Sequence, residues 1–341
     1  MLEKKSRPFL SICVAIYNVS SYLNECLTSL SKIPYAEIEF LLVDDGSIDS
    51  SKKICDEFVS KDPRFKKITH DKNKSLIQAR KTGIQNALGE YILFVDGDDK
   101  IIPEAIHKLI FELKKIKPDL LQFEVRCFGP SEFHPESFDN NFKIKNFSEE
   151  LNPVNYRKQI FIWRTVPWNL FNKVYKKTVA EKCLSGIGNL RLTSGEDAVL
   201  TFLMAHIAKK ISQISLPLYC YRIGSGISKG DVTFSKFNQQ VKDLRLTNII
   251  SDSSKRIGLI EIDSLSLKHL NIALLELTIS RYWKLPLRDK GKAFHLLTEE
   301  NLNLFRFSLI SLRLLLNYSS RLIFPRGSYI RYLLKKKLKY R

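Results

Sequence analysis

Residues Tyr91–Asp99 read YILFVDGDD, and this stretch decides the fold. Its first five residues are apolar or aromatic, follow Gly89, and are too few for a typical helix. A run of this kind predicts a short strand that is buried on both faces, as in a parallel sheet. The strand leads directly into three carboxylates, which are those of Asp96, Asp98 and Asp99. The chain therefore places a concentrated negative charge at the carboxyl end of a buried strand.

These carboxylates predict a divalent-metal site. Like charges at the end of a buried strand cost stability unless a cation compensates them. Mg²⁺ and Mn²⁺ prefer oxygen ligands of this kind and usually bridge to substrate phosphates. A short DxD sequence also occurs in solvated acidic turns and in helix caps, which is the alternative interpretation. The rest of the sequence is needed to distinguish a metal site from a solvated turn or a helix cap.

Length and composition indicate a folded protein with room for two domains. The chain has 341 residues, of which 44% are hydrophobic and 27% are charged. Its net charge is +19, and residues 301–341 contain ten Lys and Arg but no Asp or Glu. More than half of the excess positive charge is therefore in the last segment. A basic tail of this kind fits an anionic membrane as well as a nucleic acid.

Cysteine, histidine and apolar residues exclude several other classes of protein. The cysteines show no CxxC spacing and predict a reducing cytoplasm with neither disulfides nor zinc; they are Cys13, Cys26, Cys55, Cys127, Cys183 and Cys220. The six histidines show no metal spacing, and none is assigned to a site. Residues 9–17 follow a basic start as in a signal peptide, but they lack a cleavage site and are better explained as a strand. No run approaches the roughly 18 apolar residues of a spanning helix, so an integral membrane protein is not expected.

The first part of the chain alternates strands with helices. Strands are predicted at Phe9–Tyr17, Glu39–Val43, Lys66–Thr69 and Tyr91–Val95. Helices are predicted to begin at Ser20 or Ser21, at Ser50 or Ser51, after Ser75 and at Pro103. This alternation indicates an α/β protein with parallel strands and right-handed crossovers.

Polar clusters follow three of these strands, and they are Tyr17-Asn18, Asp44-Asp45-Gly46-Ser47 and Asp96-Gly97-Asp98-Asp99. Ligands of such sheets bind beyond the carboxyl ends of the strands, so the three clusters should converge on one site. The glycine-rich dinucleotide motif and the phosphate-binding GxxxxGK[ST] motif are both absent. Any phosphate must therefore be bound by a metal and by side chains.

Several segments resemble family 2 glycosyltransferases. The segments AIYNVSSYLNECLTSL, FLLVDDGSIDSS and QARKTGIQNALGEYILFVDGDD have the order and spacing of that family over residues 8–115. Weaker similarity, in VPWNLFNKVYKK, GEDAVLTFLM and YRIGSGIS, extends to about residue 230. The resemblance implies the GT-A fold, which is a Rossmann-like, mostly parallel sheet flanked by helices. The chain departs from the family pattern at Ala15-Ile16, Ser75 and Lys81, and the last two border the expected donor pocket.

The resemblance also implies a nucleotide-sugar site with a divalent metal, Mn²⁺ or Mg²⁺. Asp45 would accept the imide N–H of uracil, although an ordinary Asp-Gly turn is the alternative. Arg80 would lie near the pyrophosphate, and its alternative is a surface arginine. Asp98 would hold the metal and Asp99 would support it as a second metal residue. The other donor-site residues by this resemblance are Tyr17, Asn18, Asp96 at the ribose, Gly97, and Arg222 in a loop over the diphosphate at Tyr219–Ser228.

Inverting transfer also needs a general base to take the proton of the acceptor hydroxyl. Glu196 and Asp197 open an apolar helix, where carboxylates are often only favourable partners of the helix dipole. By resemblance, Asp197 is the base and Glu196 its supporting neighbour. Trp168 either forms a wall of the acceptor site or belongs to the core. Residues 126–165 carry turn signals, and the short runs between them predict hairpins.

The chain becomes helical after about residue 230. A helix is predicted at Asp263–Trp283 and another from Leu302, with apolar residues on one face and arginines on the opposite face. This pattern, next to a polybasic end, predicts a helix that lies in a membrane interface, or alternatively a packed helix with a solvated tail. The expected domains are 1–230 (a nucleotide-sugar half, 1–115, and an acceptor half, 116–230), a helical extension at 231–300, and a basic membrane-associating tail at 301–341.

Together these features predict a metal-dependent, inverting glycosyltransferase. It would transfer a sugar from a nucleotide-sugar, most simply a UDP-sugar, to a growing lipid-linked glycan. It would be cytoplasmic and peripheral on the inner face of the plasma membrane. The alternatives are a nucleotide-sugar-binding protein without turnover and a basic nucleic-acid-binding protein. No nucleic-acid partner is expected, because no RNA- or DNA-binding module is recognisable and the excess charge lies beyond the α/β region.

Overall fold

The structure, a computed structural model, describes residues 7–131, 136–144, 150–192, 195–224, 232–241, 245–259, 262–299, 307–308 and 310–311. The chain divides into two compact units. The first consists of Met1–Ile160, Arg164–Lys229 and Ile249–Ile262, and the second of Phe161–Trp163, Gly230–Asn248 and Asp263–Arg341. The division lies near the predicted boundary at residue 230, but it places Ile249–Ile262 in the first unit and not in the helical extension.

The first unit is built on a sheet whose described strands have the order β3-β2-β1-β4-β7-β6-β8-β5. Four neighbouring strands are parallel, and they are β1 (Leu10–Ile16), β2 (Ile38–Asp44), β3 (Phe65–Thr69) and β4 (Tyr91–Asp96). The bounds of all four lie within one residue of the prediction, which is therefore confirmed for this half of the sheet. The apolar runs of β1, β2 and β4 succeed as signals because these strands are buried on both faces, whereas the edge strand β3 is only partly buried.

The other half of the sheet is mixed. Strand β7 (Lys173–Lys176) pairs antiparallel with β4 on one side and with β6 (Leu120–Phe128) on the other. Strand β8 (Ile211–Arg222) runs parallel to β6, and the short β5 (Lys100–Ile101) pairs antiparallel with the end of β8. The sequence after residue 170 is thereby brought next to β4, the strand that ends in the carboxylates.

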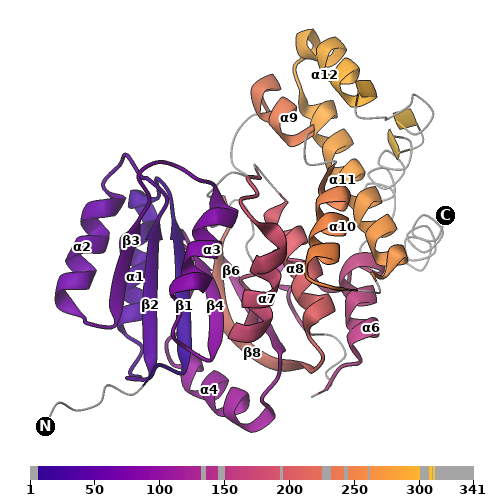
Figure 1. Ribbon diagram of the computed structural model, residues 1–341. Helices are drawn as coiled ribbons and strands as arrows, with labels where there is room; N and C mark the ends of the chain where they lie inside the picture. Colours follow the sequence, from indigo (N-terminus) through magenta and orange to yellow (C-terminus); the bar gives the residue numbers. More distant parts are fainter. Residues whose placement is uncertain are drawn as a thin grey trace, which may run out of the picture. The chain divides into compact units, whose positions relative to one another are not determined.

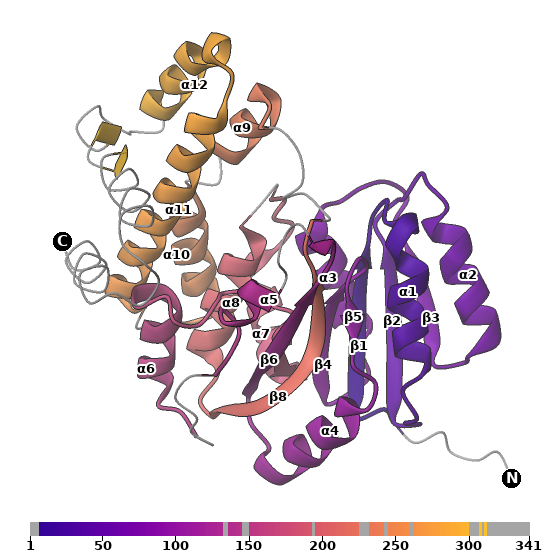
Figure 2. The ribbon, with the colours of Figure 1, turned by 180° about the vertical axis from the view of Figure 1, so that it is seen from behind.

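Helices cover both faces of the parallel strands. Helices α3 (Leu76–Asn86) and α7 (Lys177–Ile187) lie in front of the sheet in Figure 1. Helix α1 (Ser20–Ser31) lies on the opposite face, which is turned toward the viewer in Figure 2. Side chains of α4 (Ala105–Ile116) belong to the same hydrophobic core cluster as those of α1. A Cβ on Gly83 of α3 would lie 3.1 Å from Cys13 Sγ, so glycine lets this helix approach β1 closely. Helices α2 (Ser51–Lys61) and α8 (Glu196–Ile207) also belong to the first unit.

Two predictions for the first unit are wrong. Residues 126–165 do not form hairpins where they are described: β6 continues to Phe128 and is followed by α5 (Glu136–Asp139), α6 (Pro153–Arg157) and a π-helical turn at Lys158–Ile162. Turn signals therefore separated helices here and not strands. The predicted loop from Tyr219 does not begin there either, because Tyr219–Arg222 end β8 and pair with neighbouring strands.

The second unit is helical, as predicted. It contains α9 (Phe234–Val241), α11 (Ser264–Lys284) and α12 (Leu287–Glu299), whose apolar side chains form a core of their own. Asp263 caps α11, because its side chain accepts a hydrogen bond from the Ser266 N–H. Helix α10 (Leu246–Arg256) has residues in both units. Among the described helices, none has both the length and the apolar character needed to cross a bilayer. The predicted basic tail, 301–341, lies outside the described residues except for four positions.

Candidate active site

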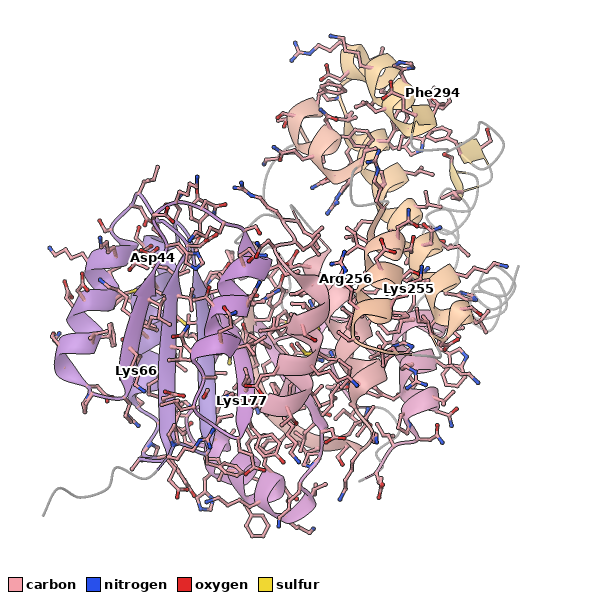
Figure 3. The ribbon with its side chains drawn as sticks, viewed as in Figure 1. Asp44, Lys66, Lys177, Lys255, Arg256 and Phe294 are labelled. Carbon is pink, nitrogen blue, oxygen red and sulfur yellow. The ribbon has the colours of Figure 1, made fainter. Side chains whose placement is uncertain are left out.

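The carboxyl ends of the parallel strands form one edge of the sheet, and the predicted polar clusters lie along it. Asp44 ends β2 opposite Ile16 of β1, and Asp96 ends β4 opposite Ala15. Figure 3 shows Asp44 at the carboxyl ends of the strands and Lys66, near the start of β3, toward the opposite ends of the strands. Topology therefore brings together residues that are about 30 and 80 positions apart in the sequence, as parallel strands require.

The loops after β1 and β2 are joined by hydrogen bonds. The Asn18 N–H donates to Ser47 Oγ over 3.1 Å, and Asn18 Oδ1 accepts from the Ile48 N–H at 2.9 Å. Asn18 has a φ of 52°, a left-handed conformation that asparagine tolerates better than most residues. Tyr17, beside it, is 45% exposed. Asn18 thus holds the two loops together, while the Tyr17 ring is available to a ligand.

Asp45 is buried and organises the segment that follows β3. Its Oδ1 accepts from the Lys74 N–H at 2.8 Å and lies 2.6 Å from His70 Nδ1, while its Oδ2 accepts from the Ser75 N–H at 2.9 Å. Ser75 has a φ of 89°, which is strained for a residue with a side chain. The bond to Asp45 helps to hold this conformation. Oδ2 has one protein donor and therefore keeps a lone pair for a ligand N–H.

His70 was assigned to no site by its sequence pattern, yet it belongs to this one. It lies between Asp45 and Thr82, with 2.9 Å from His70 Nε2 to Thr82 Oγ1. The sequence did contain a signal that His70 lies at this edge, because His70 directly follows β3 just as Asp45 directly follows β2. Residues that follow parallel strands reach the same edge, whatever their spacing in the sequence.

Arg80 connects the two halves of the site. It lies on α3 and is 2% exposed. Its Nη2 lies 3.1 Å from Asp96 Oδ1, its Nη1 lies 3.4 Å from Glu196 Oε1, and Nη1 also donates to Asp197 Oδ1. The carboxylate that ends β4 and the two that open α8 thus share one guanidinium. Sequence reasoning placed Arg80 near a pyrophosphate, whereas in the structure both terminal nitrogens have carboxylate partners.

The shared cation does not neutralise this cluster. Burial raises the pKa of Asp96 to about 6, and the charges of Asp197 and Asp98 add to the rise while Arg80 opposes it. Burial likewise raises the pKa of Glu196, and the charge of Asp197 adds to the effect. Neighbouring carboxylates in one pocket titrate together and hold a proton more readily than isolated ones. The cluster therefore combines a carboxyl that takes up a proton, Glu196, with the directly ion-paired Asp197.

The turn after β4 is tied to the end of β8. Asp99 is 1% exposed, and its Oδ2 accepts from the Tyr219 hydroxyl at 2.7 Å while its Oδ1 accepts from the Arg222 N–H at 2.6 Å. The same Tyr219 oxygen accepts from the Asp96 N–H at 3.1 Å. Burial, together with the charges of Asp96 and Asp98, raises the pKa of Asp99 well above its usual range. Tyr219 was not singled out by sequence reasoning, because its partner is 120 residues away.

Arg222 is held beside this turn. Its Nε donates to the Asp98 carbonyl over 2.8 Å, and its guanidinium pairs with Glu25. The guanidinium carbon also lies 4.8 Å from the centre of the Tyr22 ring and 4.4 Å from that of Phe128. Arg222 is thus brought to the predicted donor side of the site. It reaches this place at the end of a strand and not within a loop.

The fit of a divalent metal rests on Asp98. This side chain is partly exposed, while Asp99 is buried with both oxygens accepting hydrogen bonds. At Gly97, between these residues, an added Cβ would lie 3.0 Å from Val19 Cγ2, so glycine allows the turn to pack closely on the loop after β1. Within the described part of the chain, no group of three or more His, Cys, Asp or Glu side chains is arranged to hold a metal alone. The donor set fits an ion that takes further ligands from a bound diphosphate.

Comparisons of the sequence with known proteins identify its relatives. A sequence model described as glycosyl transferase family 2 matches residues 11–175. Glycosyltransferase GlyG of Streptococcus pneumoniae is 41% identical over 229 residues, which covers 64% of this chain and 71% of GlyG.

The chain belongs to glycosyl transferase family 2. The putative glycosyltransferase EpsH of Bacillus subtilis is 32% identical over 217 residues, covering 63% of this chain and 61% of EpsH. Glycosyltransferase GlyA of S. pneumoniae is 30% identical over 228 residues, covering 64% of this chain but only 31% of GlyA. The shared family confirms the resemblance seen in the strand-end motifs.

Solved structures share the fold. S. aureus TarS 1-349 in complex with UDP aligns with a TM-score of 0.59 at 19% identity, over 97% of this chain and 87% of that one. The mannosyltransferase PcManGT from Pyrobaculum calidifontis, in complex with GDP-Man and Mn²⁺, aligns with a TM-score of 0.51 at 13% identity, over 97% of this chain and 85% of that one. The predicted GT-A fold, with a helical C-terminal region, is thereby confirmed.

Proposed function

We propose that this chain is a metal-dependent, inverting glycosyltransferase that transfers a sugar from a nucleotide-sugar to a hydroxyl group. The observation that carries the proposal is the Arg80 cluster. It joins the strand-end carboxylate expected at the donor, Asp96, to the pair expected at the acceptor, Glu196 and Asp197. Donor-binding and proton-accepting groups are then adjacent, as a single displacement at the anomeric carbon requires.

The donor is proposed to be a UDP-sugar. Oδ2 of Asp45 would accept the imide N–H of uracil with its remaining lone pair, and Asn18 and Tyr17 would border the base. TarS has been solved with UDP and with UDP-GlcNAc, which supports a uridine nucleotide, whereas PcManGT has been solved with GDP-Man. The site should therefore reject a nucleotide whose nucleobase lacks this N–H, because the buried carboxylate of Asp45 would then lose a hydrogen bond.

Asp98 is proposed to hold the metal, Mn²⁺ or Mg²⁺, together with the diphosphate oxygens. When bound, the ion supplies positive charge to the leaving group. Asp99 is proposed to position Asp98 and the end of β8 and not to act as a direct ligand, because it is 1% exposed and bonded to Tyr219 and Arg222. Arg222, at the same turn, lies where its guanidinium can exchange Glu25 for a phosphate oxygen. Asp96 is proposed to bind the ribose.

Asp197 is proposed to be the general base. It takes the proton of the attacking hydroxyl at Oδ1 or Oδ2, and Arg80 holds it in place. Glu196 is proposed to be the supporting group, because burial and the charge of Asp197 raise its pKa and favour its protonated form. A protonated Glu196 also leaves Arg80 to Asp96 and Asp197. The pair thus divides into a base and a neutral supporting group.

The acceptor is proposed to be a growing lipid-linked glycan, reached from the cytoplasmic face of the plasma membrane. The support is the composition of residues 301–341, which carry ten basic and no acidic residues. Such a segment is attracted to anionic lipids. The first two curated relatives are spanned by this chain over 61% and 31% of their length, so the acceptor has to be established on this protein.

The decisive experiment measures UDP binding with and without Mn²⁺. UDP at one hundred times its dissociation constant should stabilise the wild type by about 2.7 kcal/mol in a thermal-shift assay. Asp98→Ala should weaken UDP binding in Mn²⁺ and change it little in EDTA. Glu104→Ala, at an acidic residue before α4, is the control for a general loss of negative charge. Equal UDP affinity of wild type and Asp98→Ala in saturating Mn²⁺ contradicts the proposed metal site.

A further inference from the structure

Lys173, the first residue of β7, is a buried ammonium group without a carboxylate among its hydrogen-bond partners. It is 0% exposed, and its Nζ donates to the Pro167 carbonyl at 3.0 Å, the Asn169 carbonyl at 2.6 Å and Asn172 Oδ1 at 2.6 Å. Three donors thus meet three neutral acceptors. Burial lowers the pKa of Lys173 to about 7, while the charge of Asp197 opposes the change. Keeping a lysine in such a place costs stability.

A second buried side chain binds the same turn. Thr201 lies on α8 and is 0% exposed, and its hydroxyl donates to the Trp168 carbonyl at 2.7 Å. The carbonyls of three successive residues, Pro167, Trp168 and Asn169, therefore all accept from side chains of other elements. Thr201 follows Asp197 by four residues, which is about one helical turn. The backbone of the turn is thereby tied to the helix that begins with the proposed base.

We propose that Lys173 and Thr201 are positioning residues that clamp residues 167–172 and present the Trp168 indole to a sugar ring of the acceptor. This inference rests on the proposed function, because it requires a sugar acceptor that binds near α8, the helix that begins with the proposed base. Trp168 itself is only half-buried, while its backbone is held on both sides. The backbone of Trp168 is therefore held in place, while part of its side chain stays exposed.

The physical benefit of the clamp is orientation. A sugar ring presents C–H groups to an aromatic face, and indole offers the largest such face among side chains. The acceptor hydroxyl must lie close to both the anomeric carbon and the base, and a displacement of about 1 Å can reduce the rate roughly 10²-fold. A turn gives this accuracy only if its carbonyls are held by rigid elements. Strand β7 and helix α8 provide the two anchors.

A purely structural role makes a different prediction. Lys173→Met leaves three buried acceptors without their donor, so it should cost stability whether or not Lys173 orients the turn. If Lys173 contributes only to stability, the exposure of the Trp168 indole should stay as it is in the wild type. If the lysine is a clamp, the turn should loosen.

The test uses Trp168 as its own reporter. Trp163→Phe and Trp283→Phe leave Trp168 as the single tryptophan of the chain, and its quenching by acrylamide is then measured without any ligand. Thr201→Val removes one hydroxyl at nearly constant volume, and Lys173→Met removes the ammonium. Thr278→Val is the matched control, since Thr278 is also a buried helical threonine, but its hydroxyl bonds the Leu274 carbonyl of its own helix.

We expect Thr201→Val and Lys173→Met to increase the quenching of Trp168, and Thr278→Val to leave it unchanged. With methyl glycosides of glucose, galactose and N-acetylglucosamine as probe acceptors, kcat/KM for the acceptor should fall by roughly 10- to 100-fold. The dissociation constant of UDP in Mn²⁺ should stay within about twofold, since a factor of two is only about 0.4 kcal/mol. Unchanged quenching in Thr201→Val overturns the clamp, even if Lys173→Met fails to fold. Failure of the wild type to bind UDP would instead contradict the proposed function and leave the quenching result valid.

Discussion

Replacing Arg80 by methionine should destabilise the protein strongly, and more so at alkaline than at acidic pH. Arg80 is buried and compensates the charge of three carboxylates. Its guanidinium nitrogens lie 3.1 Å from Asp96 Oδ1 and 3.4 Å from Glu196 Oε1, and Nη1 donates a hydrogen bond to Asp197 Oδ1. At an effective dielectric constant of about 20, two unit charges at this separation attract by roughly 5 kcal/mol. Desolvation of the arginine offsets part of this attraction. Removing one partner of a buried ion pair therefore costs about 3–5 kcal/mol, because it leaves uncompensated charge.

The pH dependence follows from the carboxyl groups. The pKa of Asp96 in the folded protein is already raised to about 6, and the loss of Arg80 would raise it further. Between about pH 4 and this pKa the folded state binds more protons than the unfolded state, so stability falls as pH rises. At pH 5 the carboxyl is protonated and needs no cation, whereas at pH 8 it is ionised. The loss in Arg80→Met should therefore approach the full 3–5 kcal/mol only at pH 8.

Urea unfolding at pH 5 and pH 8 measures both quantities. Arg80→Lys serves as the control, because it keeps the charge but one ammonium cannot replace two guanidinium nitrogens directed at different carboxylates. Its loss should be intermediate. A loss below about 1 kcal/mol for Arg80→Met at pH 8 lies in the range of an exposed ion pair and would refute the buried cluster. An equal loss at both pH values would refute the reasoning from Asp96.

Further predictions concern the base, the turn after β4 and the tail. Asp197→Asn should keep the UDP affinity while transfer falls by roughly 10²–10⁴, and Glu196→Gln should remain active; the reverse pattern in steady-state kinetics makes Glu196 the base. Tyr219→Phe should cost about 1–3 kcal/mol in urea unfolding, because buried Asp99 loses a donor, and no loss would mean that water replaces the hydroxyl. Deletion of 301–341 should abolish salt-sensitive sedimentation with anionic vesicles and leave UDP binding intact, and an unfolded product would show that this segment belongs to the core.

The parallel half of the fold was predictable from local sequence. Strands β1, β2 and β4 are short apolar runs that are buried on both faces, so composition alone reveals them, whereas β3 (FKKIT) is a partly buried edge strand. Their polar ends could be assigned to one edge without a structure, because parallel strands connected by helices share their direction. Asp45, Asp96 and Asp98 were found in this way.

The antiparallel half was not predictable by the same reasoning. Strand β7 has four residues, and it owes its place to pairing with β4 and β6. The region before it was predicted as hairpins because turn signals do not reveal which elements they separate. Short strands and helices of similar composition are distinguished by what they pack against, which the local sequence does not contain.

Local sequence identified the candidate residues for the proposed chemistry, whereas tertiary packing set the partners of these residues. Asp197 could be identified as a candidate base, but its ion pair with Arg80, 117 positions away, depends on how α3 and α8 pack around the sheet. Lys173 had no sequence signal at all, because a lysine is normally exposed, and only the turn at 167–172 supplies acceptors for its ammonium. Hydrogen bonds and ion pairs act over about 3 Å in space, so partners far apart in the chain are defined only once the chain has folded.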